Sequence, residues 1–192
     1  MQKLAVTDIA DLREYERERD EFRREIIAMK KRRRIAVGEF MTMVFENTAT
    51  MRFQIQEMAR VERILTDEAI EHEVDTYNEL IPDDGELSAT MFIELTEPDA
   101  LREWLPKLVG IEDHISIVVG DASSPAVEQD AERLTREDTT SSVHYLKFSF
   151  SPDQQAAFAT GPVRIVVDHP ECRAEVELDD AQRAELAGDF AH

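Results

Sequence analysis

The spacing of apolar residues predicts a long helix near the start of the chain. Over residues 8–34, apolar side chains recur at three- and four-residue steps, which places them on one face of a helix. Arg19 also falls within this stripe, so a cation is predicted on the apolar face. The stripe is made of Leu12, Tyr15, Phe22, Ile26 and Met29.

Two more helices are predicted in the middle of the chain, over residues 54–65 and 67–81. Thr66 stands between them as a candidate N-cap. The first of them opens with strand-like alternation at FQIQ, but from Ile55 onward its apolar residues follow helical spacing. The two helices are close in sequence, and we expect them to pack antiparallel as a pair.

Most of the remaining chain alternates with the period of two that is typical of strands. Residues 120–142 are rich in Asp, Ser, Glu and Thr, and they predict a polar connection with at most a short helix or strand. Strands are predicted within 35–51 as a hairpin, and at 87–95, 115–119, 142–150, 163–168 and 172–178. Short helices are predicted at 96–110, 151–159 and 179–187.

These elements predict an α+β fold. Strands and helices mix without regular βαβ spacing, which favours a mainly antiparallel sheet. We expect a helical N-terminal arm over residues 1–34, and a single α+β domain over residues 35–192 that contains the central helix pair. The arm either folds back on its own body or is exchanged between two copies, so a homo-oligomer is one expectation.

Composition narrows the class of protein. A single cysteine in 192 residues excludes an intrachain disulfide and favours a reducing compartment. The first residues carry charges and lack the apolar run of a signal peptide. The longest apolar runs fall far short of the roughly 20 residues that cross a bilayer. We therefore expect a cytoplasmic protein without a membrane partner.

The charge is strongly negative and unevenly distributed. The formal net charge is −20, yet residues 1–34 hold eleven Lys/Arg against eight Asp/Glu. An acidic body disfavours nucleic acid as a partner, because that affinity rests on neutralising phosphates. The basic run at the end of the arm has two interpretations. Its cations complement the helix dipole, or Arg32, Arg33 and Arg34 bind a protein partner.

One glutamate is predicted on a buried helix face. Glu62 falls between Ile55 and Met58 on the helical wheel, and Glu73 flanks the apolar face of the next helix. A carboxylate there must be paired, ligate a metal or stay protonated, because desolvating it alone costs several kcal/mol. Glu62 therefore either forms a structural ion pair with Arg19, or joins Glu73 in a metal site.

Two histidines complete the candidate metal ligands. His144 shares the parity of Leu146 and Phe148 in its predicted strand, which places it on the buried face. His169 follows Asp168 at a strand end, and an aspartate there can orient a histidine ligand. Iron or zinc are the metals that this mixture of imidazole and carboxylate suggests. The alternative is a pair of packed, hydrogen-bonded histidines.

The sequence contains no signature of phosphate binding or of a serine nucleophile. It does resemble a bacterial family of uncharacterised proteins, domain of unknown function family 3501. The resemblance extends from Met1 to about Leu186, and His169 lies within a family segment. The segments that carry it are EFRREIIAMKKRRRIAVG, FQIQEMARVERI, YNELIP, ELSATMFIEL, VHYLKF and VVDHP.

Members of this family are encoded beside rubrerythrin-like proteins and iron–sulfur oxidoreductases. The resemblance therefore implies an accessory role in peroxide or redox stress, with one of those proteins as the partner. It supplies no catalytic residues. Two functions follow as hypotheses. One is an accessory protein that acts through its surface, and the other is a metal-binding protein or metalloenzyme that uses Glu62, Glu73, His144 or His169.

Overall fold

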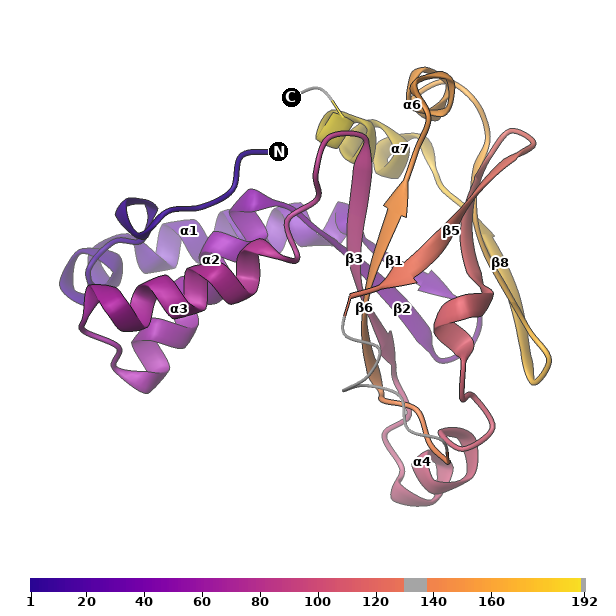
Figure 1. Ribbon diagram of the computed structural model, residues 1–192, viewed down its shortest axis with the longest axis horizontal. Coiled ribbons are helices and arrows are strands. Elements are labelled where there is room, and N and C mark those ends of the chain that lie inside the picture. Colours follow the sequence, from indigo (N-terminus) through magenta and orange to yellow (C-terminus); the bar gives the residue numbers. More distant parts are fainter. Residues whose placement is uncertain (130–137, 191–192) are drawn as a thin grey trace.

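An eight-stranded antiparallel sheet forms the body of the molecule (Figure 1). The computed structural model describes residues 1–129 and 138–190. The strands follow one another in the sheet as β1-β2-β3-β6-β5-β4-β7-β8. The edge strands β1 and β8 also lie against each other, so the sheet curls into a nearly closed barrel. The strands are β1 (Arg34–Val37), β2 (Met41–Glu46), β3 (Glu86–Ile93), β4 (Ile115–Val119), β5 (Ala122–Glu128), β6 (Val143–Ser149), β7 (Val163–His169) and β8 (Cys172–Glu177).

The predicted α+β class with an antiparallel sheet is confirmed. Alternating burial along the strands explains why the barrel closes around an apolar interior. In β6, Leu146 and Phe148 are fully buried, while the alternate residues Val143, Tyr145 and Lys147 are partly exposed. In β7 the same pattern buries Val163, Ile165 and Val167. Side chains of one parity thus fill the interior as one core.

The helices begin at polar caps, as their sequences predict. The side chain of Thr66 accepts a hydrogen bond from Ala69 N, and that of Ser151 accepts one from Gln154 N. Asn47 caps α2 in the same way, so this helix begins six residues before its predicted start. The helices are α1 (Leu12–Arg33), α2 (Thr48–Glu62), α3 (Asp67–Asn78), α4 (Pro98–Trp104), α6 (Pro152–Phe158) and α7 (Asp180–Ala187), with 3₁₀ turns η1 (Val6–Asp8), η2 (Ile111–His114) and η3 (Gly188–Phe190).

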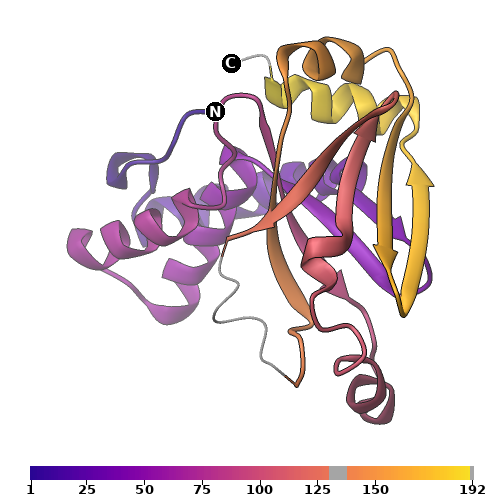
Figure 2. The same cartoon turned by 45° about the vertical axis from the view of Figure 1, so that its right-hand side comes forward.

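Three helices extend sideways from the barrel (Figure 1). We call α1, α2 and α3, with the segment before α1, the helical projection. Its interior is a second, smaller apolar cluster built around Leu4, Met51, Ile55, Val74 and Ile81. At the barrel, α6 and α7 lie at one end and α4 lies at the other (Figures 1 and 2).

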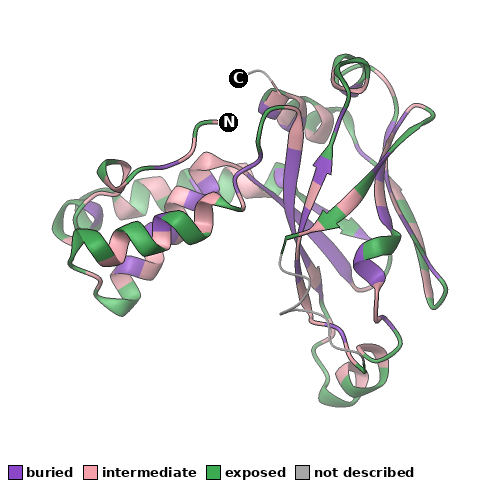
Figure 3. Ribbon diagram, viewed as in Figure 1, coloured by how far each residue is buried: buried purple, intermediate pink, exposed green. Residues whose placement is uncertain are grey.

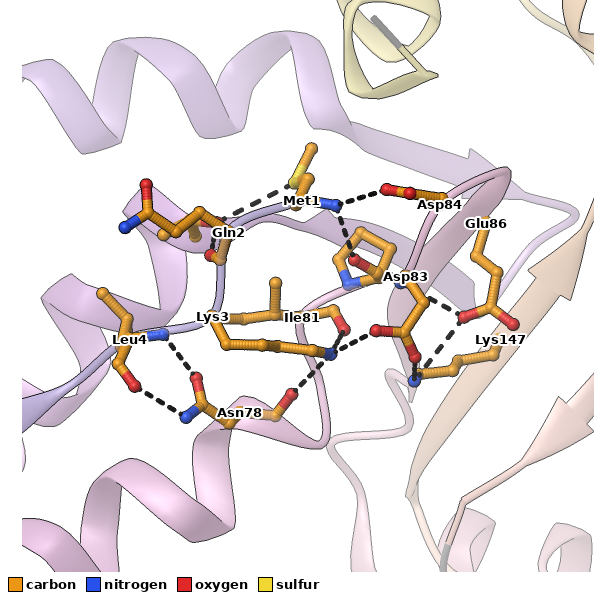
Figure 4. Close-up of polar contacts among 12 residues, drawn as sticks. Met1, Gln2, Lys3, Leu4, Asn78, Ile81, Asp83, Asp84, Glu86 and Lys147 are labelled. Carbon is orange, nitrogen blue, oxygen red and sulfur yellow. Dashed lines mark hydrogen bonds and ion pairs between the residues drawn. The ribbon is translucent and has the colours of Figure 1, made fainter. Parts of the chain in front are cut away.

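The N-terminal segment is held across the end of α3 by side-chain hydrogen bonds (Figure 4). The amide of Asn78 accepts from Leu4 N at 2.8 Å and donates to Leu4 O at 2.9 Å. Lys3 Nζ donates to Ile81 O at 2.6 Å and pairs with Asp83 at 2.9 Å. The hydrogen bond from Lys3 lowers the pKa of the Asp83 carboxyl. These contacts close the projection on the side that faces the barrel.

Arg19 is held by a carboxylate, but not by the predicted one. Glu57 accepts from Arg19 Nε at 2.7 Å and from Arg19 Nη2 at 2.9 Å, and it also accepts from the Tyr15 hydroxyl at 2.7 Å. The hydrogen bond from Arg19 lowers the pKa of the Glu57 carboxyl. Burial, reinforced by the bond to Glu57, raises the pKa of Tyr15. This network fastens α1 to α2.

We expect Glu57→Gln to lower the free energy of unfolding by about 1–2 kcal/mol at pH 7, since it weakens charge-assisted hydrogen bonds. The folded pKa of Glu57 lies below its unfolded value, so this stabilisation is present above about pH 4 and is lost as the pH falls through the folded value. Urea unfolding at pH 7 and pH 3 measures it, and the gap between variant and wild type narrows at pH 3. An equal gap at both pH values contradicts the assignment. Glu16→Gln, which weakens the more exposed pair with Arg60, is the control.

Candidate metal centre

His144 points into the barrel from the beginning of β6. Its side chain is fully buried, and it shares its inward face with Leu146 and Phe148. The prediction that His144 lies on the buried face of its strand is therefore confirmed. A polar ring on an otherwise apolar face requires partners, because an unpaired buried polar group is costly.

Two glutamates supply such partners. Glu128 ends β5 directly opposite Leu146 of β6, and opposite residues of an antiparallel pair face the same side of the sheet. Glu112 comes from η2, which packs against β5. Candidate ligand atoms of Glu112, Glu128 and His144 all lie within 4.8 Å of one another. We call these three residues the Glu–Glu–His cluster.

Hydrogen bonds orient the imidazole of His144. Its Nε2 lies 3.0 Å from Ser141 O and 3.1 Å from Thr140 Oγ1. Because a carbonyl oxygen can only accept, Nε2 carries a hydrogen and donates it to Ser141. Nδ1 then faces Glu128 Oε1 at 2.5 Å, the distance of a short hydrogen bond. A metal-ligating histidine is held in the same way, with one nitrogen bonded to a carbonyl and the other presented to the ion.

The carboxylate of Glu128 is deeply buried and incompletely satisfied. The side chain is 2% exposed, and its Oε2 has no hydrogen-bond partner among the described residues. Leaving a buried carboxylate oxygen without a partner costs at least 1–3 kcal/mol, by a rough estimate. A cation beside Oε2 would remove this cost. The cluster therefore has the chemistry of a site for a divalent metal.

The dimensions of the cluster are close to those of a metal site. Donor atoms around a tetrahedral ion with bonds of 2.0–2.1 Å lie about 3.4 Å apart. Oε1 of Glu128 and Nδ1 of His144 are nearer than this, so an ion that bound both atoms would move the two groups apart. One imidazole with two carboxylates suits zinc, iron(II) or manganese(II).

His169, the other histidine predicted as a ligand, is held by hydrogen bonds and ring packing within the fold. Its Nδ1 accepts a hydrogen bond from Glu171 N at 3.3 Å, and its Nε2 donates to Val109 O at 3.2 Å. The ring also packs edge-on against His114, with the ring centres 5.0 Å apart. Both nitrogens are thus used within the fold, and His169 does not join the Glu–Glu–His cluster. The hydrogen-bonded alternative describes His169 best.

Glu62 and Glu73 occupy the helical projection, away from the cluster. Glu62 is exposed, which corrects the expectation that it lies on a buried face and pairs with Arg19. Burial raises the pKa of Tyr77 on α3, and the charges of Glu73 and Glu62 raise it further. Among the described residues, however, the set of potential metal ligands that converges is Glu112, Glu128 and His144.

The arginines predicted to bind a partner are engaged within the chain. Arg33 is buried and bonds to Asp189, so it cannot meet a partner at the surface. Arg32 pairs with Glu185 at 2.7 Å, and Arg34 pairs with Glu94. The reason is that α1 ends against the barrel, where acidic groups from distant parts of the chain surround these three arginines.

Two members of the cluster were not predicted from the sequence. Glu128 lies in the stretch interpreted as a polar connection, and the structure instead has β5 there. A signal was present in VVGDAS, because Gly120–Asp121 is a two-residue hairpin turn that pairs Val119 with Ala122. Counting parity from that turn would have placed Glu128 on the inner face. Glu112 belongs to a short 3₁₀ turn, for which periodicity gives no signal.

Comparison with known proteins shows the family of the chain. A model of the family described as protein of unknown function (DUF3501) matches residues 3–190. The chain belongs to this family. The crystal structure of a novel protein of unknown function from Burkholderia pseudomallei K96243 is similar, with 34% sequence identity and a TM-score of 0.91. That alignment covers 98% of this chain and 100% of the other.

No curated protein matches the chain. Neither the family description nor that of the similar structure states an activity. In the described part of the chain, no helix combines the length and apolarity needed to cross a bilayer.

Proposed function

We propose that this protein binds one divalent transition-metal ion at the Glu–Glu–His cluster. The observation that carries the proposal is the buried oxygen Oε2 of Glu128, which lacks a hydrogen-bond partner among the described residues while its carboxylate faces an oriented imidazole. His144 would ligate through Nδ1, because Ser141 O holds the opposite nitrogen. Glu112 and Glu128 would complete three protein ligands.

Three protein ligands leave one or more positions on the ion for another molecule. Structural zinc sites are usually closed by four protein ligands, whereas catalytic sites keep one position open. The cluster has the second arrangement, which makes it more suitable for reactivity or exchange than for bracing the fold.

The test is the metal content of untagged protein, grown with iron, zinc and manganese available and purified without a chelator. We expect close to one equivalent by elemental analysis. We expect His144→Ala and Glu128→Gln to weaken binding at least tenfold, at the lower end of the effects seen for groups that support metal ligands. A folded wild type that is metal-free, and that takes up none of these ions when titrated without oxygen, would reject the proposal.

Matched controls separate ligation from a general effect of removing a buried group. Glu46→Gln alters another buried glutamate, which accepts from Thr90 Oγ1 outside the cluster. His169→Asn alters a buried histidine whose nitrogens both have partners. We expect both controls to keep their metal. Loss of metal in either of them to the same degree as in Glu128→Gln would point to unfolding rather than ligation.

A redox role is the extension that family membership suggests. We propose that the metal serves an accessory function in a redox or peroxide-stress system, with a rubrerythrin-like or iron–sulfur protein as the partner. Support for this part comes from the family resemblance. Co-purification of such a partner with wild type, but not with His144→Ala, would tie the role to the cluster. Equal capture by wild type and His144→Ala would show that partner binding does not depend on the metal site.

A further inference from the structure

A short turn before β6 contacts the histidine of the Glu–Glu–His cluster. Thr140 is 3% exposed, and its hydroxyl oxygen lies 3.1 Å from His144 Nε2, the ring nitrogen that does not face Glu128. The same nitrogen lies 3.0 Å from Ser141 O. One N–H group therefore stands between two oxygens, and both of them can accept from it. Residues 140–142 thus determine which nitrogen of His144 is left for a ligand.

The side chain of Thr140 is suited to holding this ring. A β-branched residue has a restricted χ1 torsion, so its hydroxyl group has few alternative positions. The turn itself is also fixed, since Ser141 Oγ accepts from Val143 N at 3.0 Å and Ser142 O accepts from Ile93 N of β3 at 2.9 Å. A hydroxyl group on a fixed turn can set the orientation of a ring, whereas one on a free loop would follow it.

The backbone of Thr140 is attached to the segment that carries Glu112. Thr140 N donates to Leu105 O at 3.2 Å, directly after α4. From there tight turns lead to Glu112, and one of them is closed by a hydrogen bond from Ile111 N to Leu108 O at 3.0 Å. The side chains of Leu108 and Ile111 are fully buried, and η2 is buried over part of its length (Figure 3). The imidazole and the carboxylate of Glu112 are therefore held in one rigid frame.

We propose that Thr140 is a positioning residue of the metal centre, whose hydroxyl oxygen orients His144 from a turn that is anchored to the segment of Glu112. This inference rests on the proposed function, because it assigns a role within that site. Thr140 would not ligate the ion, since it contacts Nε2 while the ion would bind Nδ1. Groups that hold a ligand in this way typically contribute about 10–100-fold to metal affinity.

Thr140→Val tests the role of the hydroxyl group, because valine keeps the branched shape and removes the oxygen. Titration with Co²⁺ alone measures the affinity, and the visible absorption of the bound ion reports the arrangement of its ligands. We expect Thr140→Val to bind Co²⁺ at least tenfold more weakly than wild type and to give an altered spectrum. Thr140→Ser, which restores the hydroxyl group, should recover most of this loss.

Thr90→Val provides the matched control. Thr90 is also buried, and its hydroxyl group donates to Glu46 Oε1 at 3.1 Å, outside the cluster. We expect this variant to bind Co²⁺ like wild type. Urea unfolding of the metal-free proteins is measured in parallel. A merely structural role for Thr140 would lower the free energy of unfolding and leave the Co²⁺ affinity of the folded protein unchanged.

The outcomes separate this inference from the metal proposal. A folded wild type that binds neither Co²⁺ nor zinc nor iron(II) would reject the metal site, and the role of Thr140 with it. A wild type that binds Co²⁺ no better than Thr140→Val would overturn the role of Thr140 and leave the metal site standing. So would a loss that Thr140→Ser does not recover or that Thr90→Val shares, because the hydroxyl group at His144 would then not be its cause.

Discussion

Replacing Arg33 by methionine is expected to lower the free energy of unfolding by about 3–5 kcal/mol, the range for removing one partner of a buried ion pair. The guanidinium is 1% exposed. Its Nε donates to Phe45 O at 2.9 Å, and its Nη1 donates to Asp189 Oδ1 at 3.1 Å. Nη2 bonds to the other oxygen of Asp189. Without the cation, this carboxylate stays buried with its charge uncompensated by the guanidinium.

Arg32→Met provides the matched control, because Arg32 is adjacent and shares Glu185 with Arg33 but is half-exposed. We expect it to cost less than about 1 kcal/mol. Arg33→Lys should lose much of the stability as well, since an ammonium cannot reproduce the two-pronged contact of a guanidinium. Urea unfolding followed by circular dichroism measures all three. Equal losses for Arg33→Met and Arg32→Met would show that the buried pair is not special.

Gly38→Ala is expected to destabilise the fold by about 2–4 kcal/mol, from two sources. Gly38 turns β1 into β2 with a φ of +69°, a left-handed conformation that penalises any side chain. A Cβ at this position would also lie 2.9 Å from Ala174 Cβ on β8. Atoms that close must move apart, so the substitution disturbs the contact between the two edge strands of the barrel.

Gly120→Ala separates these two sources. Gly120 has a similar φ of +60°, but a Cβ there meets nothing within 4 Å. We expect this variant to cost about 1–2 kcal/mol, from the backbone alone. Adding Ala174→Gly to Gly38→Ala should recover part of the excess, because it removes the atom that is crowded. Thermal unfolding of wild type, the two single glycine variants and the double variant measures these losses of stability. An equal loss for Gly38→Ala and Gly120→Ala would exclude the steric contribution.

The sequence correctly predicted the structural features that depend only on residues close together along the chain. Alternation in SVHYLKFSF gave both the strand and the inward face of His144. Capping residues gave the starts of α3 and α6. These predictions succeed because strand parity and helix caps are determined within a few residues.

What failed depended on partners far away in sequence. The helical wheel centred the buried face of α2 near Glu62, but the buried residues Met51, Ile55 and Ala59 show that the face is rotated away from it. Among the described residues, Val61 at the end of α2 is 70% exposed despite its apolar character. The carboxylate that pairs with Arg19 was expected to be that of Glu62, but it is that of Glu57, five positions earlier. Periodicity indicates that a helix has an apolar face, whereas tertiary packing determines which residues lie at the centre of the buried face.

The pairing of Arg33 with Asp189 joins residues 156 positions apart, and this has a consequence for how the chain folds. During synthesis α1 leaves the ribosome long before its partner, so the guanidinium of Arg33 must stay hydrated until Asp189 follows. The edge strand β1 likewise waits for β8. Such distant contacts slow folding, because loop-closure entropy is lost before they form. The barrel is therefore completed only after β8 has been synthesised, and until then the β1 edge is open to pairing with other chains.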